Sequence, residues 1–524
     1  MRSETPPRGW DNLVVGGGSA GAALAARLSE DPGRRVLLLE AGPDYADADE
    51  IPAEMLARAT SDAGIAHDWG FTAEAVPGRR IAYPAGKVTG GSSAVNSGVA
   101  LRGAPADYDE WATMGAHGWA WDDVLPYFRR LESDRDFGGP AHGVDGPIPI
   151  RRTPPEEFLP THRALFEAAL ELGHPEAPDL NEPGALGVGP WPMNVSRGVR
   201  VSTAMAYLTP AVRSRPNLKI RPSAPVARVR FADRRAIGVE LAGGETVDAS
   251  EVAICAGAIS TPGILVRSGI GSREQVHAAG ATLLEERVGV GENLMDHAFA
   301  WLCVVPAPGV CGDLDVRSVQ AGLRYTAAGS PEEGDMQLLI VIPVDLGATP
   351  ALAERAGASV VFMIGAGLQR PHSRGRVVWA DPDPLAQPRI ELNLTAGAAD
   401  VGRLRDGLRL AWEVAESPRM APNVERIALL SREELEDDAA LDAYIESVVM
   451  TFKHPAGTAA MGAADDPRAV VGADGSVHGV DGLRVADMSI APNIPRANTN
   501  LTAIMIGERV ADLTAEKPAR GWSR

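Results

Sequence analysis

Two kinds of hydrophobic pattern alternate along the chain, and the first is typical of an α/β unit. Short apolar runs are followed by helices rich in small or apolar residues, as in parallel strands with their crossover helices. The pattern predicts strand 13–15, helix 20–28, strand 35–39, a strand and helix within 251–271, strand 483–486 and helix 499–513. We therefore expect one α/β unit assembled from three separate parts of the sequence.

The second kind of pattern predicts an antiparallel sheet. Apolar runs are separated here by short turns rich in Gly, Pro and Asp, which favour sharp reversals between neighbouring strands. The expected strands are 300–305, 336–342, 359–365, 375–380 and 389–392, and helices follow at 400–416 and 432–449.

Together the two patterns predict a mixed α/β fold with two domains. A Rossmann-like nucleotide-binding domain is interrupted by an inserted substrate domain, which is built on the antiparallel sheet and flanked by helices. We expect the first domain to comprise residues 8–155, 200–298 and 450–520, and the second to comprise 156–199 and 299–449. A ligand site between two such domains is the usual arrangement.

The first glycine-rich stretch, Gly16 to Gly21, reads G-x-G-x-x-G between the first strand and its helix. In this motif Gly16 permits a tight turn, Gly18 lets the backbone approach a pyrophosphate, and Gly21 allows close packing of helix and strand. The open N–H groups and the dipole of the helix start favour phosphate charge. Glu40 ends the second strand, where a carboxylate accepts hydrogen bonds from a ribose diol. The stretch predicts dinucleotide binding but does not distinguish FAD from NAD.

Composition narrows the class of protein without identifying a substrate. The chain has 524 residues, 45% of them hydrophobic, which is ordinary for a globular protein of more than one domain. A formal net charge of −19 argues against nucleic acid and anionic membrane surfaces as partners. No apolar run is long enough for a transmembrane helix, and the three cysteines form no metal-ligand spacing. With a short polar N-terminus, these features predict a cytoplasmic enzyme without a metal site.

Two further stretches are rich in glycine. In Gly86 to Asn96 the glycines let the backbone approach a flat or phosphorylated ligand, while Ser92 and Asn96 offer hydrogen bonds. A flexible loop is the alternative interpretation. The stretch 257–271 has the pattern of a strand-to-helix junction with an architectural role, and it places the backbone of Ala256 near the adenine end of a nucleotide.

His454 is the candidate base. It opens the sequence His-Pro-Ala-Gly-Thr after a predicted helix, where proline and glycine fix a special backbone path. A neutral imidazole near pH 7 can accept a hydroxyl proton, and Asn498 can supply the hydrogen bond that orients an alcohol. The alternative for a single histidine is a satisfied structural side chain.

These motifs, in this order and spacing, resemble the glucose–methanol–choline (GMC) family of flavin-dependent oxidoreductases over about residues 10–514. The resemblance implies that the dinucleotide is FAD. The implied FAD contacts are Gly16, Gly18, Ser19, Ala20 and Gly21 at the pyrophosphate; Glu40 and Ala41 at the adenosine ribose; Gly86, Val88, Gly91, Ser92 and Asn96 over the pyrophosphate and flavin edge; Val226 and Ala256 near adenine; and Asp487 and Thr499 toward the ribityl chain and flavin. Some members bind FAD covalently through a histidine where this chain has Val95, so we expect non-covalent FAD.

The resemblance also implies the oxidation of a small-molecule alcohol, with a primary alcohol expected. His454 matches the family's base and takes the hydroxyl proton, Asn498 matches the second site position, and hydride passes to the N5 atom of the flavin. Reduced flavin is reoxidised by O₂ or by an electron carrier such as a quinone, and no motif decides between oxidase and dehydrogenase. In overall pattern the chain is most similar to hydroxymethylfurfural-oxidase-like and choline-dehydrogenase-like members, and the sequence from Ala497 to Leu501 favours the former, which act on primary aromatic or furanic alcohols.

Several positions leave the substrate open. Phe299 stands where choline oxidases carry a glutamate that would pair with a quaternary ammonium, and a cation–π contact is the alternative. His297, two residues earlier, is interpreted as structural, and Lys453 replaces a tryptophan that some members carry before the base. Hydroxynitrile lyases of this fold keep FAD without redox turnover, but they carry a second histidine where Asn498 stands. A non-catalytic binding protein would not need His454, and an NAD enzyme would not carry the C-terminal motifs.

Overall fold

A parallel sheet forms the centre of the first unit in this computed structural model, which describes residues 9–56, 67–311, 319–347 and 349–516. Its strands lie in the order β10 (Leu218–Arg221), β2 (Val36–Leu39), β1 (Trp10–Val15), β13 (Thr246–Ile254) and β24 (Leu483–Val485). The first half of β13 also pairs antiparallel with β12 (Arg235–Leu241), which pairs with β11 (Val226–Ala232). These pairings confirm that the unit is assembled from separate parts of the chain.

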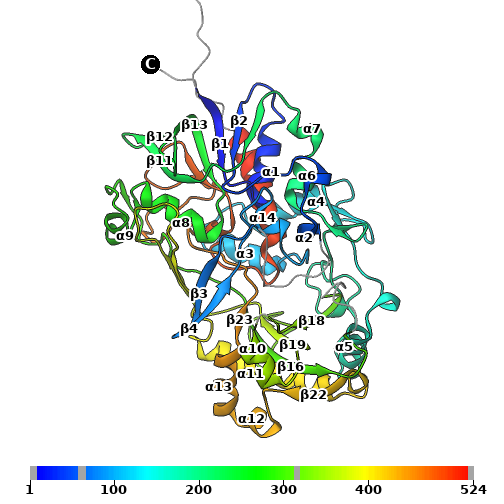
Figure 1. Ribbon diagram of the computed structural model, residues 1–524. Coiled ribbons are helices and arrows are strands. Elements are labelled where there is room, and N and C mark those ends of the chain that lie inside the picture. The colour runs from blue at the N-terminus through cyan, green and yellow to red at the C-terminus, as the bar shows by residue number, and fades with distance from the viewer. Residues whose placement is uncertain (1–8, 57–66, 312–318, 348, 517–524) are drawn as a thin grey trace, which may run out of the picture.

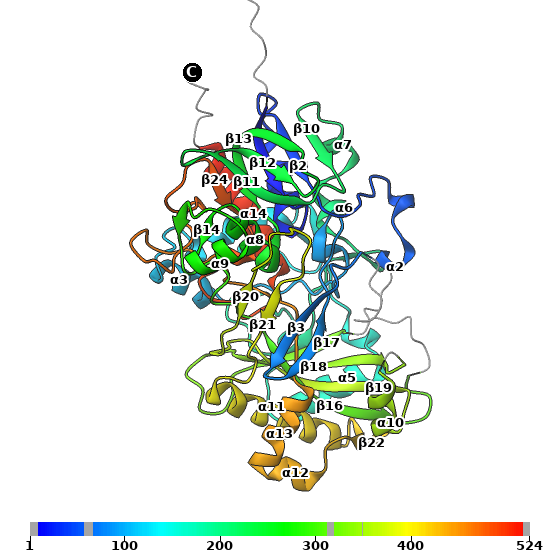
Figure 2. The ribbon, with the colours of Figure 1, turned by 60° about the vertical axis from the view of Figure 1, so that its left-hand side comes forward.

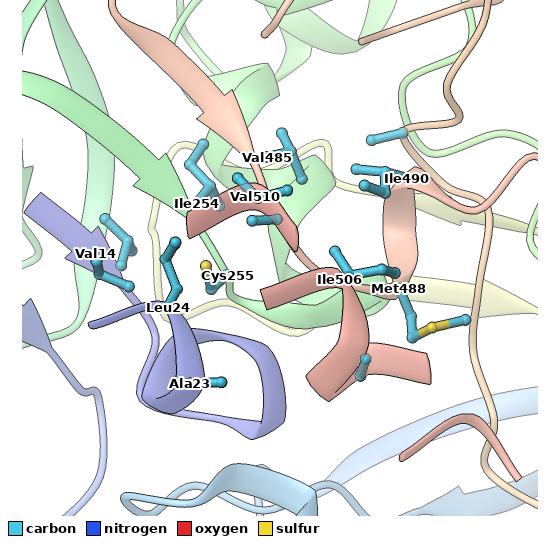
Figure 3. Packing of buried hydrophobic residues seen from close by; sticks show 14 of the residues in the cluster. Val14, Ala23, Leu24, Ile254, Cys255, Val485, Met488, Ile490, Ile506 and Val510 are labelled. Atoms are coloured by element: carbon cyan, nitrogen blue, oxygen red, sulfur yellow. The ribbon is translucent and has the colours of Figure 1, made fainter. Parts of the chain in front are cut away.

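The two helices that cover this sheet come from opposite ends of the chain. Figure 1 shows α1 (Ser19–Leu28) and α14 (Thr499–Ala515) side by side at the parallel sheet. In Figure 3 the labelled side chains of Val14, Leu24, Ile254 and Ile506 belong to one buried cluster. The helices approach closely because Gly507 has no side chain: a Cβ atom there would lie 2.3 Å from the carbonyl oxygen of Ala20.

An antiparallel sheet forms the second unit, at the lower end of the molecule in Figure 1. Its order is β22 (Val424–Ala428), β16 (Ala298–Pro306), β19 (Val360–Leu368), β18 (Met336–Asp345), β17 (Ala321–Tyr325) and β7 (Gly187–Pro190). The helices α5 (Pro160–Glu171), α11 (Ala398–Glu416) and α13 (Asp438–Val448) pack on this sheet. The short strand β23 (Met450–Thr451) pairs with the start of β16, so the residues after it leave the sheet at its edge.

Two expectations about this region were wrong. The strands expected at 375–380 and 389–392 do form, as β20 (Arg376–Val378) and β21 (Arg389–Glu391), but not in the large antiparallel sheet. They join β3 (Phe71–Val76) and β4 (Arg79–Tyr83) in a separate sheet, with β21 parallel to β3. Figure 2 shows this sheet between the two larger ones. It combines segments of both predicted domains, whose boundaries stay a prediction, and the bounds at 8 and 520 lie outside the described residues.

The second error concerns the helix expected at 432–449, which is broken at Asp437. The chain forms α12 (Arg432–Glu436) and then α13, because Asp437 adopts an extended backbone and its side chain accepts a hydrogen bond from the N–H of Ala440 at 2.8 Å. An aspartate in this position caps a new helix instead of continuing the old one.

The remaining elements are short helices and strands that connect the sheets. They are α2 (Ala53–Leu56), α3 (Pro105–Thr113), α4 (Trp121–Leu131), α6 (Thr203–Tyr207), α7 (Pro210–Arg213), α8 (Gly257–Arg267), α9 (Arg273–Ala278), α10 (Pro350–Ala356), β5 (Glu132–Asp134), β6 (Ile148–Ile150), β8 (Val195–Ser196), β9 (Val199–Arg200), β14 (Ile270–Gly271) and β15 (Glu285–Glu286). Within the described ranges, none of the helices combines the length and the apolar character needed to cross a bilayer.

Candidate active site

A cavity of about 360 Å³ runs from the carboxyl ends of β1 and β13 to the residues that follow β23. This volume is within the range of ~300–1,000 Å³ that is common for small-molecule sites. Every site residue expected from the sequence lines it, except Gly21 and Val88. A Cβ atom at Gly21 would lie 1.9 Å from the carbonyl oxygen of Gly16, so this glycine serves the packing of α1. The side chain of Val88 is fully buried, in a separate small cluster with Met55 and Ala94.

Glycines bring two loops into contact at one end of this cavity. Gly16 has a φ of +99°, and a Cβ atom there would lie 2.5 Å from the carbonyl oxygen of Cys255. A Cβ atom at Gly91, in the second glycine-rich loop, would lie 2.7 Å from the Cα atom of Gly18. Gly18 directly precedes α1 and offers no side chain to cap the first N–H groups of the helix. Two backbone loops and a helix start therefore form a cradle that fits a pyrophosphate.

Glu40 lies beside this cradle at the end of β2. Its carboxylate accepts hydrogen bonds from the N–H groups of Gly17 and Gly42, each at 2.8 Å. Burial raises the pKa of Glu40 to about 7, although both backbone N–H groups act in the opposite direction. Each oxygen keeps further acceptor capacity, which suits a ribose diol.

Asp487 lies farther along the same wall and is already well bonded. Its side chain accepts hydrogen bonds from the N–H of Gly257 and the hydroxyl of Thr261 at 2.8 and 2.7 Å, and from the N–H of Ser489 at 2.8 Å. The carboxylate therefore ties the loop after β24 to the start of α8. Ser19, at the start of α1, donates to the side-chain oxygen of Asn500 in α14 at 2.8 Å.

At the other end of the cavity, Asp296 holds the backbone of His454 in place. The N–H of His454 donates to Oδ1 of Asp296 at 2.9 Å, and the hydroxyl of Tyr83 donates to Oδ2 at 2.5 Å. Burial raises the pKa of Asp296, while hydrogen bonds from Thr451, Tyr83 and the backbone offset part of the rise. The position of the imidazole is thus set by β4 and by the loop before β16, as well as by its own segment.

Both nitrogens of the His454 ring have partners. Nε2 lies 3.2 Å from the amide nitrogen of Asn498, and Nδ1 lies 2.9 Å from Nδ1 of His297. An amide nitrogen only donates, so Nε2 of His454 accepts and Nδ1 carries the proton, which it donates to His297. Burial lowers the pKa of His454 well below its usual value, and His297 and Lys453 lower it further. His454 is therefore neutral near pH 7, with the lone pair of Nε2 directed toward Asn498.

His297 is the partner that the sequence did not reveal. Its side chain is fully buried, and burial lowers its pKa to about 3, so it stays neutral and can accept the proton of His454. The two histidines are 157 positions apart. Asp296, the neighbour of His297 in the sequence, accepts a hydrogen bond from the backbone N–H of His454.

The sequence did not reveal the aromatic neighbour of His454, or the backbone conformation of Lys453. The ring of Phe452 stacks on that of His454, with centroids 5.6 Å apart and planes 12° apart. Lys453 lines the cavity with a left-handed backbone, at a φ of +62°. Local sequence patterns do not reveal such a conformation for a lysine, which normally avoids positive φ.

Comparison with known proteins gives concordant matches. Two family models, both described as GMC oxidoreductase, match residues 10–299 and 371–507. A 5-(hydroxymethyl)furfural oxidase from Methylovorus sp. (strain MP688) is 37% identical, over 96% of this chain and 98% of that protein. An oxygen-dependent choline dehydrogenase from Xanthomonas euvesicatoria pv. vesicatoria (strain 85-10) is 36% identical, over 98% of this chain and 96% of that protein. The crystal structure of pyridoxine 4-oxidase from Mesorbium loti superposes with a TM-score of 0.89 at 31% identity, over 97% of this chain and 99% of that one.

Proposed function

Because the chain belongs to the GMC oxidoreductase family, we propose that it oxidises an alcohol to a carbonyl compound, with His454 as general base and FAD as cofactor. The observation that carries the proposal is the meeting of His454 and Asn498 at 3.2 Å, in the wall of the cavity that Gly16 and Glu40 also line. Flavin-dependent alcohol oxidation needs a base and a nucleotide cradle in one site.

GMC oxidoreductases bind FAD, and the cavity fits this cofactor. The close approach of Gly18 and Gly91 leads to a helix start without a side-chain cap, which suits a pyrophosphate, and Glu40 offers carboxylate oxygens for a ribose diol. Val95 lines the cavity with an aliphatic side chain, which cannot form a bond to the flavin. We therefore propose that FAD is bound non-covalently, and acid precipitation should release all of it with the mass of free FAD.

The residues of the chain handle the proton of the substrate. The substrate hydroxyl donates to Nε2 of His454 and accepts a hydrogen bond from the amide of Asn498. When Nε2 takes the proton, the ring becomes a cation whose Nδ1–H keeps its acceptor on His297. FAD, when bound, supplies the acceptor for the hydride of the substrate carbon.

We propose a primary alcohol as substrate and O₂ as first electron acceptor. One relative is named for a hydroxymethyl compound and as an oxidase, and another is named oxygen-dependent. Phe299 is buried on β16, against Phe452, and does not line the cavity, so no observation favours a quaternary ammonium substrate. Admitting O₂ or a soluble quinone to the reduced enzyme, and following the rate of flavin reoxidation, separates an oxidase from a carrier-linked dehydrogenase.

The test is anaerobic mixing of the purified holoenzyme with a panel of primary alcohols while flavin absorbance is followed. We expect His454→Ala to retain FAD and to be reduced roughly 10²–10⁴-fold more slowly, which is typical for loss of a positioned base. His277→Ala is the matched control, because His277 is an exposed residue of α9 that does not line the cavity. Flavin reduction by His454→Ala at the wild-type rate would contradict the role of His454 as general base. Failure of every alcohol to bleach the wild type would remove the proposed reaction.

A further inference from the structure

We propose that the active site selects an alcohol that also carries a carboxylate, and that Lys453 binds this second group. This inference rests on the proposed alcohol oxidation and names the substrate class of that same site. Lys453 lines the cavity, directly before His454 in the sequence and two residues after the end of β23.

The backbone of Lys453 is fixed on both sides. Its own N–H donates to the hydroxyl of Thr451 at 2.7 Å, and the next N–H, of His454, donates to Asp296 at 2.9 Å. Between these bonds Lys453 adopts a φ of +62°, a left-handed conformation that is unfavourable for a non-glycine residue. The side chain is therefore held at the substrate end of the cavity by a backbone that cannot relax easily.

The charges around this cavity are unevenly placed. Among its described lining residues, the charged side chains besides the histidine are Glu40, Asp487, Arg267 and Lys453. Glu40 and Asp487 are held by backbone N–H groups away from His454, and Arg267 at the end of α8 donates to the carbonyl of Ala227. Lys453 is thus the charge next to the base, and its effect is felt on the imidazole, whose pKa it lowers.

A cation in this position complements an anion on the substrate. An ammonium group has three N–H donors, so it can bind a carboxylate while it keeps another contact. A quaternary ammonium group would instead be repelled. Phe452 adds an aromatic ring beside the base, since it lines the cavity, stacks on His454 and packs against Phe299 with ring centroids 4.9 Å apart. A flat ring that carries a hydroxymethyl group and a carboxylate therefore matches this site: the hydroxyl meets His454, the ring meets Phe452 and the carboxylate meets Lys453.

The test compares three alcohols of one shape: 4-(hydroxymethyl)benzoate, benzyl alcohol and a benzyl alcohol with a para trimethylammoniomethyl group. Flavin reduction in the holoenzyme gives the ratio of second-order rate constants for carboxylate over neutral alcohol. We expect a ratio of about ten or more in the wild type, since hydrogen bonds to charged groups are worth a factor of this size. Lys453→Met should bring the ratio close to one, and Lys453→Arg should keep it. Lys219→Met, on the exposed edge of β10, is the matched control and should also keep it.

A second measurement does not need turnover. Benzoate and benzamide are titrated into each holoenzyme, and binding is followed by the change in the flavin spectrum. We expect benzoate to bind the wild type about tenfold more tightly than Lys453→Met, with little difference for benzamide. Equal binding of benzoate to both proteins would overturn this inference. So would a carboxylate-to-neutral rate ratio near one in a wild type that benzyl alcohol still reduces. Both results leave the proposed alcohol oxidation standing. Reduction by none of the alcohols would overturn the proposed function and the substrate class with it, whereas benzoate binding would still test the role of Lys453.

Discussion

Replacement of His297 by alanine tests whether the pair of histidines sets the protonation of the base. In the structure Nδ1 of His297 accepts the proton on Nδ1 of His454 at 2.9 Å, and this leaves Nε2 of His454 unprotonated. Alanine removes the acceptor in a place that water does not reach, because His297 is fully buried. The Nδ1–H of His454 then has no partner, and the alternative tautomer, with the proton on Nε2, becomes competitive.

The size of the effect follows from the cost of a lost acceptor. A buried donor left without a partner costs about 1–3 kcal/mol, and each 1.36 kcal/mol changes a rate tenfold. If the whole cost falls on the reactive tautomer, His297→Ala should slow anaerobic flavin reduction by a factor of about 5 to 150. The fold should survive, since His297 is not a member of the hydrophobic cluster that forms the core of the antiparallel sheet.

His297→Asn is the decisive companion variant. The side-chain oxygen of asparagine can occupy the place of Nδ1, so it can accept the same proton and should restore most of the rate. Both variants should be compared at equal FAD content, with stopped-flow reduction by a single alcohol as the assay. A flavin-reduction rate of His297→Ala within twofold of the wild type, or a rate of His297→Asn as low as that of His297→Ala, would contradict this role of His297.

Three further predictions use other charges of the molecule. Because burial lowers the pKa of His454, the rate of flavin reduction should stay constant from pH 8 to 6.5 and fall only at lower pH; half-loss near pH 6.5 or above would contradict this. Glu40→Ala removes the acceptor of two N–H groups and should weaken FAD binding about tenfold or more, as measured by FAD retention on gel filtration. Buried His142 lies 3.3 Å from Asp134 and 2.8 Å from Asp179; burial alone would lower its pKa, but hydrogen bonds to these carboxylates raise the pKa to about 11. His142→Gln should therefore lose about 3 kcal/mol of unfolding free energy at pH 7, a difference that is fully present below pH 6.5 and vanishes as pH rises through 11.

The parts of the fold that were predictable from the sequence are those with local signals. The strand, glycine turn and helix from Trp10 to Leu28 combine a hydrophobic period with turn chemistry, and both act over a few residues. The break at Asp437 was missed because the pattern of polar and apolar residues in α12 continues into α13. Only the hydrogen bond from the N–H of Ala440 to the Asp437 side chain marks the start of the second helix. The sheet of β3 and β21 was missed because its parallel pairing joins segments about 300 residues apart, for which no local pattern exists.

The candidate site divides in the same way. Glycines and Glu40 could be predicted as candidate site residues because each lies at a fixed offset from a strand end. The contact of His454 with His297 could not, because it depends on how β23 meets the start of β16. Lys453 was recognised only as a difference from related sequences, and its left-handed backbone follows from bonds to Thr451 and Asp296 that the sequence does not contain as a pattern.

The packing of α1 on α14 explains why residues from the two ends of the chain form one site. Gly507 lets α14 lie directly on the backbone of Ala20, and Ser19 donates a hydrogen bond to Asn500, the second residue of α14. The residue that precedes α14 is Asn498, so the same contact that orients the start of α1 toward the cavity also sets the amide beside His454. Nucleotide cradle and base are therefore not independent features, because a shift between these two helices displaces both at once.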